Sequence, residues 1–375
     1  MKDKDYFKEI KEIEKFYTEI ITTLDLTFPK CINLQEEKRK FFTARVDDKF
    51  YNPQLKFIKK DFDEKIIEKL NNFKINTFFD KYGIKKLYKE RLEEIKNEIK
   101  YQSMWGNSQN TKYIIKCKGI PSRKLLKKAQ KFAKEYQRVK VRFERLTPRK
   151  IGNALKNYVK ELTGDEVKVE YFDMPSKVNI EPALKLIQIN PNERFTSLDL
   201  DRLKAHEIDV HYMRYFNGRN SGIKLLENGT AQYLKTEEGI AVFNEDREGV
   251  LSKAQMFIYA GRVIATYYCL TKSFFEIFEI LKEHNFPDRA AFMITYRAKR
   301  NLCDTSQLGG FTKDYVYFEG YLIIKEYSKN HDINELMMGK IKLEDLKKLK
   351  KFKKKLMPEV VTSFSEETQE DIQES

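Results

Sequence analysis

The chain has 375 residues, of which 41% are hydrophobic and 13% aromatic. This composition excludes an intrinsically disordered protein, and the length is sufficient to bury a core without disulfide staples. The four cysteines are far apart and form no Cys-x-x-Cys pair, so the sequence suggests neither a disulfide framework nor a thiolate zinc site, and a reducing, cytoplasmic setting fits best. The formal net charge of +15 favours an acidic partner, either nucleic acid, anionic lipid or an acidic peptide, without choosing among them.

The first part of the chain is predicted to be helical. Apolar residues recur at helical spacing in residues 1–45, an N-terminal helical extension, and in residues 46–138, the helical part of the main domain. The N-terminus is too charged for a secretory signal, and the most apolar stretch, 256–270, is interrupted by Arg262. We therefore expect no membrane span.

Strands are predicted from Val139 onward, where apolar and charged residues begin to alternate. The strand candidates lie at residues 139–143, 167–171, 177–180 and 186–189. A helix over 147–162 should separate the first two, because Pro148 suits a first helical position and Gly164 a helix end.

The main domain is expected to run from residue 46 to 357, with its strand-containing catalytic part at 139–357. Residues 358–375 are acidic and contain no Lys or Arg, so we expect a disordered tail. The fold class predicted from this order of elements is α+β: mostly helical, with a small, mostly antiparallel sheet before the helix described next.

Two of the four histidines lie on one predicted helix, as His206-Glu207-Ile208-Asp209-Val210-His211. Thr196 or Ser197 should cap this helix, and Asn217-Gly218 should end it. The familiar zinc-binding spacing is His-Glu-x-x-His, so one residue is added here. On an ideal α-helix, a five-residue step leaves the two imidazoles about 140° apart, too far to share a metal. We therefore predict a local π-turn, which would return both rings to one side. The alternative is two ordinary histidines.

A catalytic zinc needs a third protein ligand and an open position for water. The segment Thr236-Glu237-Glu238-Gly239-Ile240-Ala241 is the best candidate, at the start of a helix capped by Thr236, with residues small enough to approach the histidine helix. Glu238 is chosen because it resembles the Glu of the gluzincin Glu-Gly-x-Ala signature, and Glu237 is left to support a histidine. Glu207 is placed to take a proton from zinc-bound water and pass it to the leaving amine. The alternative is two solvated acids at a helix N-terminus.

Several separated motifs resemble one family. The histidine motif, the segment at 236–241, Arg297-Ala298-Lys299-Arg300 and Phe311-Thr312-Lys313-Asp314-Tyr315-Val316-Tyr317 are similar to those of the microtubule-associated tyrosine carboxypeptidases. That family includes bacterial relatives named for a Gln-Glu-Gly-Leu-Ala motif, where this chain has Glu237 in place of Gln. The resemblance implies a carboxypeptidase with one zinc ion per chain, held by His206, His211 and Glu238, with Glu207 as acid/base. It implies removal of a C-terminal tyrosine or another aromatic residue from a protein or peptide tail, which the charge suggests is acidic.

Substrate recognition requires a receptor for the terminal carboxylate, for which Arg is well suited. Arg297 and Arg300 are the candidates, with Lys299 next; a solvated basic helix end is the alternative. Tyr315 and Tyr317 are candidates to donate to an oxyanion, although packing accounts for them equally well. The strand at 186–189 is expected to offer an edge to an extended peptide.

Two rival functions remain. The positive charge suggests a nucleic-acid-binding protein, but basic residues are interleaved with acids and no nucleic-acid-binding motif is present, so no stable nucleic-acid partner is expected. The other rival is a catalytically silent binding module. The presence of Glu207 argues against it, because a binder does not need the base.

Overall fold

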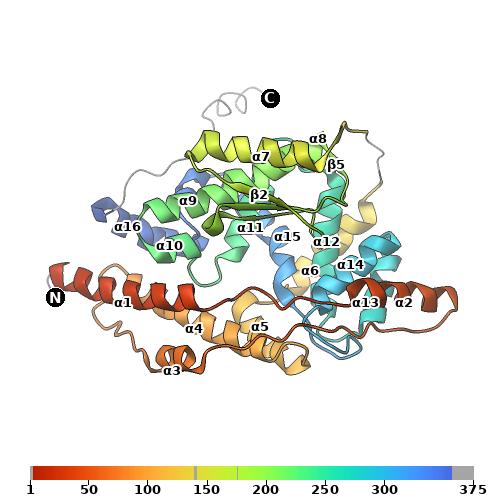
Figure 1. Cartoon of the computed structure of the whole chain (residues 1–375), viewed down its shortest axis with the longest axis horizontal. Helices are drawn as coiled ribbons and strands as arrows, with labels where there is room; N and C mark the ends of the chain where they lie inside the picture. The colour runs from red at the N-terminus through yellow and green to blue at the C-terminus, as the bar shows by residue number, and fades with distance from the viewer. Residues whose placement is uncertain (1–2, 139–141, 175, 357–375) are drawn as a thin grey trace. The chain divides into compact units, whose positions relative to one another are not determined.

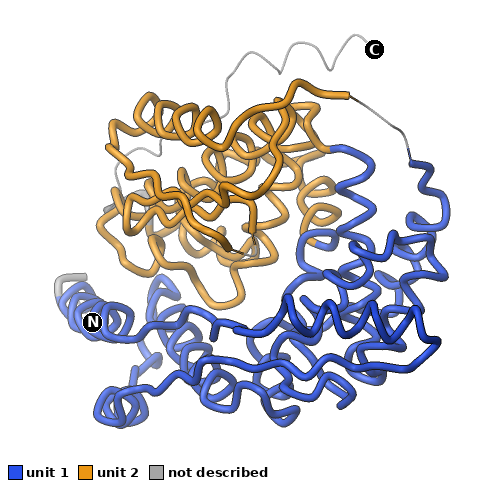
Figure 2. Tube along the Cα trace, turned by 45° about the vertical axis from the view of Figure 1, so that its right-hand side comes forward, with its two compact units in different colours: residues 1–138, 252–319 blue, residues 139–251, 320–375 orange. Residues whose placement is uncertain are grey.

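A computed structural model describes residues 3–138, 142–174 and 176–356. The chain divides into two compact units, coloured separately in Figure 2: unit 1 comprises Met1–Arg138 and Ser252–Glu319, and unit 2 comprises Val139–Leu251 and Gly320–Ser375. The predicted acidic tail at 358–375 lies outside the described residues, as do Val139 and Val141 of the first predicted strand.

Unit 1 is helical, as expected. Its elements are α1 (Asp3–Thr23), α2 (Leu34–Val46), α3 (Glu64–Asn72), α4 (Ile84–Ser103), η1 (Ser108–Asn110), α5 (Thr111–Lys118), α6 (Arg123–Glu135), α12 (Lys253–Tyr268), α13 (Phe274–Glu283), α14 (Asp288–Lys299) and η4 (Thr312–Tyr315). Helix α15 (Val316–Tyr327) begins in unit 1 and ends in unit 2. Unit 1 is stabilised in part by an aromatic cluster in which Phe41 packs edge-on against Phe274 and Phe278.

The most apolar stretch of the sequence ends a helix and does not continue into the next one: α12 ends at Tyr268 and α13 begins at Phe274. Ser273 accepts a hydrogen bond from the backbone N–H of Glu276, and the Glu276 side chain accepts in return from Ser273. This capping box starts a new helix. No helix among the described residues is long and apolar enough to cross a bilayer.

Unit 2 contains the strands. Its elements are β1 (Arg145–Leu146), α7 (Pro148–Thr163), β2 (Lys168–Tyr171), β3 (Val178–Glu181), η2 (Pro182–Leu184), β4 (Leu186–Ile189), β5 (Phe195–Thr196), α8 (Ser197–Leu203), a π-helix (Lys204–Tyr212), α9 (Met213–Asn220), α10 (Lys224–Asn228), α11 (Leu234–Arg247), η5 (Ile333–Met338), η6 (Leu343–Asp345) and α16 (Leu346–Leu356). Helices together with a small sheet agree with the predicted α+β class. Thr147 caps α7, Pro148 stands at its first turn, and Gly164 ends it at φ 72°, all as predicted.

The three-stranded sheet has the order β2-β4-β3. Strand β4 pairs with β2 in parallel and with β3 antiparallel, and β1 pairs with β5 antiparallel. The expectation that Leu186–Ile189 offers an edge is therefore wrong: β4 is central, and its backbone groups are used on both sides. Of the first predicted strand, 139–143, the described residues Arg142 and Phe143 form no strand, and the Phe143 side chain is exposed; β1 follows at Arg145–Leu146.

The core of unit 2 fixes the helix that carries the histidines. Ile151 and Leu155 of α7 pack with Ile187 of β4 and with Ile208 and Tyr212 of the π-helix, all of them fully buried. In Figure 1, α7 lies along the sheet that it covers. Burying Ile208 and Tyr212 holds the π-helix against the sheet and α7, which leaves its other side for the histidines.

The histidine helix continues past its predicted end at Asn217-Gly218. It runs to Asn220, and the chain turns at Gly222, which has φ 72°. Gly218 is required for packing instead, because a Cβ there would lie 2.3 Å from the carbonyl oxygen of Leu226.

Candidate metal centre

The predicted π-turn is confirmed: residues Lys204–Tyr212 form a π-helix between α8 and α9. Thr196 begins this run by capping α8, and its hydroxyl and the Asp199 carboxylate form a capping box. The wider π-turn accommodates the additional residue, so that His206 and His211 lie on one side of the helix. Their ring centroids are 4.9 Å apart, and the ring planes are inclined by 78°.

Helix α11 supplies the carboxylate, although its start differs from the prediction. It begins at Leu234, and the Thr236 hydroxyl caps nothing there but accepts a hydrogen bond from the backbone N–H of Leu343. Gly239 permits a close approach to α15 and not, as expected, to the histidine helix: its Cβ would lie 2.6 Å from the backbone of Gly320. A Cβ on Gly320 would in turn lie 2.2 Å from the Lys235 carbonyl oxygen. This glycine contact fixes α11, and with it Glu238.

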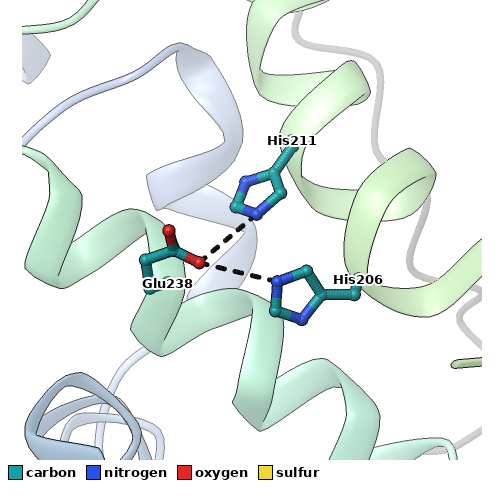
Figure 3. A group of neighbouring side chains, drawn as sticks. All are labelled: His206, His211 and Glu238. Atoms are coloured by element: carbon teal, nitrogen blue, oxygen red, sulfur yellow. Dashed lines mark ion pairs between the residues drawn. The ribbon is translucent and has the colours of Figure 1, made fainter. Parts of the chain in front are cut away.

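His206, His211 and Glu238 form a group that could hold a metal ion (Figure 3), with one ligand atom from each lying within 4.8 Å of the others. Nε2 of His206 and Nε2 of His211 are each 3.5 Å from Oε2 of Glu238. His206 is 4% and Glu238 5% exposed, and the His211 side chain is 20% exposed, so two of the three groups are buried and the third is partly exposed.

Further carboxylates hold the opposite nitrogen of each imidazole. Nδ1 of His206 lies 2.6 Å from Oε1 of Glu245, and Nδ1 of His211 lies 2.9 Å from Oε1 of Glu237. An ionised carboxylate only accepts hydrogen bonds, so in a neutral imidazole Nδ1 carries the proton and Nε2 keeps its lone pair. Both lone pairs are then directed towards the Glu238 side, as metal ligation requires.

The electrostatics of the group favour a cation. Burial alone would lower the pKa of His206, but the carboxylates of Glu238 and Glu245 outweigh burial and raise the pKa to about 9. For His211, Glu237 and Glu238 likewise outweigh burial and raise the pKa to about 10. Three buried carboxylates around two imidazoles thus stabilise positive charge. Protons on the imidazoles supply this charge in the metal-free protein, and a metal ion would supply it when bound.

These residues fit zinc. Two imidazoles and one carboxylate are a common ligand set of catalytic zinc, which leaves a position for water or substrate. The donors are nitrogen and oxygen, and Nδ1 of each ring is already fixed by a carboxylate. Glu207, the expected acid/base, follows His206 directly and is partly buried.

Sequence reasoning missed two residues that contact this group. Glu245, which is fully buried, lies seven residues after Glu238 and hence on the same face of α11. Arg214 is also fully buried, and its guanidinium pairs with Glu237. The signal in the sequence is the seven-residue spacing, which places Glu245 on the same helical face as Glu238. Asn244, seven residues after Glu237, also faces the π-helix and donates to the Ala205 carbonyl.

The predicted substrate residues belong to unit 1. Arg297 and Arg300 both pair with the buried carboxylate of Asp314, and Arg262 lies over the Tyr317 ring at 4.7 Å. We call Arg262, Arg297, Arg300 and Asp314 the arginine cluster. Burial would raise the pKa of Asp314, but the three arginines outweigh it and hold this pKa far below its usual range. Nε of Arg262 and Nε of Arg300 are buried without a hydrogen-bond partner among the described residues.

The remaining candidates make internal contacts. Lys299 is fully buried, and its ammonium donates to the carbonyl oxygens of Cys269, Gln307 and Gly309 at 2.7–3.1 Å. The hydroxyl of Tyr315 donates to the carbonyl of Lys118, and the Tyr317 ring stacks on Tyr259. These contacts are the packing alternative considered for the tyrosines, and they occupy the Lys299 donors.

Comparison with known proteins places the chain in a family. A family model described as microtubule-associated tyrosine carboxypeptidase matches residues 39–363. Microtubule-associated tyrosine carboxypeptidase 1 of Mus musculus is 32% identical over 162 residues, which are 41% of this chain and 33% of the relative. The Rattus norvegicus protein of that name is 32% identical over 161 residues, 40% of this chain and 33% of the relative.

The matched part thus spans about a third of the length of these curated relatives. A crystal structure of a Colwellia psychrerythraea protein aligns with 77% of this chain and 62% of its own at TM-score 0.46 and 11% identity, too distant to support an argument. The family model covers most of the chain, and its match contains the histidine motif, Glu238 and the arginine cluster. The chain therefore belongs to the microtubule-associated tyrosine carboxypeptidase family.

Proposed function

We propose that the protein is a zinc-dependent carboxypeptidase that removes a C-terminal tyrosine, or another aromatic residue, from a protein or peptide tail. The observation that carries this proposal is the approach of His206 Nε2 and His211 Nε2 to one carboxylate oxygen of Glu238. The name of the relatives supports the peptidase activity and the choice of residue.

Zinc, when bound by these three residues, would supply a Lewis acid that lowers the pKa of a coordinated water. Glu207 is proposed to accept the proton of the attacking water and deliver it to the leaving amine. Its position beside His206, on a helix held by the core of unit 2, supports this role. The buried Glu237 and Glu245 keep the two rings oriented, so little reorganisation is needed during the reaction.

We further propose that the arginine cluster receives the substrate carboxylate. Arg297 and Arg300 were candidates from the sequence, and Arg262 joins them. Arg297 and Arg300 pair with Asp314, and Arg262 also lowers its pKa, so guanidinium groups outnumber carboxylates within the cluster. The Nε donors of Arg262 and Arg300 suit an oxyanion. Lys299 and Tyr315 are not included, because backbone carbonyls already bond their polar atoms.

The decisive experiment is incubation of the protein with peptides that differ only in the last residue, followed by mass spectrometry. We expect loss of a single C-terminal Tyr or Phe, no cleavage of the same peptides with an amidated C-terminus, and no cleavage after chelation. Glu207→Gln should retain zinc but lose activity, whereas Glu161→Gln, an exposed residue of α7, should resemble wild type. Activity retained by Glu207→Gln would remove Glu207 from the mechanism.

A non-catalytic, nucleic-acid-binding function is the second candidate, and helix α6 favours it. The exposed residues of α6 include Arg123, Lys124, Lys127, Lys128, Lys131 and Lys134, against Glu135 as its one acid. Such a face also suits the acidic peptide tail of the main proposal. Salt-sensitive binding of DNA or RNA by the zinc-free protein, without any peptide cleavage, would favour the second candidate.

A further inference from the structure

The back of each imidazole is connected to an arginine through a carboxylate. His206 is followed by Glu245 and Arg202, whose Nη1 lies 3.3 Å from Glu245 Oε1. His211 is followed by Glu237 and Arg214. We call these the His206 relay and the His211 relay. They share the same chemistry, so their differences are informative.

The His211 relay is buried along its whole length behind the ring. Arg214 is fully buried, and Glu237 is 3% exposed. Two guanidinium nitrogens of Arg214 that do not face Glu237 are also engaged: Nε donates to the Leu336 carbonyl at 3.1 Å and Nη2 to the Ile341 carbonyl at 2.9 Å. The relay thus ends in the backbone of η5 and the loop after it, more than a hundred residues further along the chain.

The His206 relay ends differently. Glu245 is fully buried, but the Arg202 side chain is 23% exposed. Arg202 lies in α8, directly before the π-helix. An arginine in partial contact with water holds its carboxylate less firmly, because solvent competes for its donors.

We propose that Arg214 is a positioning residue of the metal centre: acting through Glu237, it fixes the ring of His211 and ties that ring to the backbone at Leu336 and Ile341. This inference rests on the proposed metal site. Arg214 acts through Glu237, on the side of the ring away from Glu238, and we expect the matching residue of the other relay, Arg202, to contribute less because its side chain is partly exposed.

The charge of Arg214 also accounts for the carboxylate at position 237. A glutamine there would accept from Nδ1 of His211 equally well, but it would leave a fully buried guanidinium without a counter-charge. The side-chain amide nitrogen of that glutamine would also place its N–H groups against the N–H groups of Arg214, so that two donors would face each other. Replacing either Glu237 or Arg214 alone would therefore leave the other charge buried without its partner, which should lower the stability of the protein.

The test measures zinc affinity by competition with a chromophoric chelator, together with the visible spectrum of the cobalt-substituted protein. Arg214→Met should weaken zinc binding about 10- to 100-fold and alter the cobalt spectrum. Arg214→Lys keeps the charge but has fewer directed donors, so it should recover only part of the affinity. Arg202→Met, the matched control, should weaken zinc binding less than Arg214→Met does.

Folding and positioning are separated by the double variant Arg214→Met with Glu237→Gln, which removes both buried charges. It should fold more stably than either single variant and still bind zinc more weakly than wild type, because its His211 is no longer anchored. Wild-type affinity and cobalt spectrum in folded Arg214→Met, or in the double variant, would overturn the inference while leaving the proposed function intact. Failure of the wild-type protein to bind zinc at all would overturn both.

Discussion

The metal triad and the arginine cluster are two groups of charged residues that differ in how their charges are arranged. In the arginine cluster, the charges face each other: Arg297 and Arg300 converge on Asp314, which is 1% exposed. In the triad of His206, His211 and Glu238, the metal-facing atoms converge on one place, while the backs of the rings are held by other residues. The arginine cluster thus has an internal counter-charge, Asp314, on which its guanidinium groups converge, whereas the triad has no internal cation and favours an added one.

The largest effect is expected from removing a ligand of the triad. His211→Ala should reduce bound zinc from about one ion per chain to almost none, because catalytic zinc sites use three protein ligands and only two would remain. Chelation of the wild-type protein should lower its unfolding temperature, and chelation of His211→Ala should not. Metal analysis and thermal unfolding measure both. His331→Ala, which removes an exposed histidine outside the site, is the control. Equal zinc content in His211→Ala and His331→Ala would show that His211 is not a zinc ligand.

The next effect belongs to the arginine cluster. Asp314→Asn should destabilise the protein by about 3 kcal/mol, because two arginines lose their buried counter-charge, but should leave zinc content unchanged. The native pKa of Asp314 lies below the ordinary 3.8, so its stabilisation is present above that pH and is lost as the pH falls towards the native pKa. The difference in the free energy of unfolding between wild type and Asp314→Asn, measured with denaturant, should therefore become smaller as the pH is lowered. Asp246→Asn, which breaks a partly exposed ion pair with Lys325, should cost less than about 1 kcal/mol.

A smaller effect concerns the glycine contact that fixes α11. Gly320→Ala should cost about 1–3 kcal/mol and also lower zinc affinity, because the added Cβ would push against Lys235 and shift the helix that carries Glu238. Gly164→Ala has open space around its Cβ and a φ of 72°, so it should cost stability through backbone strain alone and leave zinc affinity unchanged. Equal zinc affinity in both variants would show that α11 is positioned by other contacts.

The smallest effect compares two helix caps. Thr196→Ala in unit 2 and Ser273→Ala in unit 1 each remove a capping box and should each cost about 1 kcal/mol in thermal unfolding. Only Thr196→Ala should also weaken zinc binding, since α8 leads directly into the π-helix. An equal loss of zinc affinity in both variants would indicate general softening of the fold.

Much of the fold was predictable because the signals are local. The caps and ends of α7, the strands at 168–171 and 186–189, and the π-turn follow from residue types and spacing within a few positions. The meeting of His206, His211 and Glu238 was also expected, but Glu238 was chosen for its likeness to the gluzincin Glu-Gly-x-Ala signature, and the histidine spacing predicted only the π-turn.

The rest depends on tertiary partners that a single sequence does not reveal. Thr236 is a good cap by type, yet its hydroxyl bonds the backbone of Leu343, over a hundred residues away. Strand order is equally non-local, so the central place of β4 could not be read from its alternation. Lys299 and Arg297 are both basic residues of one short motif, so the sequence does not separate their roles. In the fold, the Lys299 ammonium donates to three backbone carbonyls, whereas the Arg297 guanidinium pairs with Asp314.

The π-helix makes the orientation of everything after it depend on one residue. Deleting Asp209 would restore the common four-residue separation of the histidines and allow an ordinary α-helix. It would also rotate α9 by about 100° relative to the preceding turns. Met213, Arg214 and Asn217, now buried, would then turn away from the surroundings that receive them, including the carbonyls of Leu336 and Met337. Deleting this one residue would therefore give a histidine spacing that suits zinc, but it would disrupt the packing of α9 against the rest of the chain.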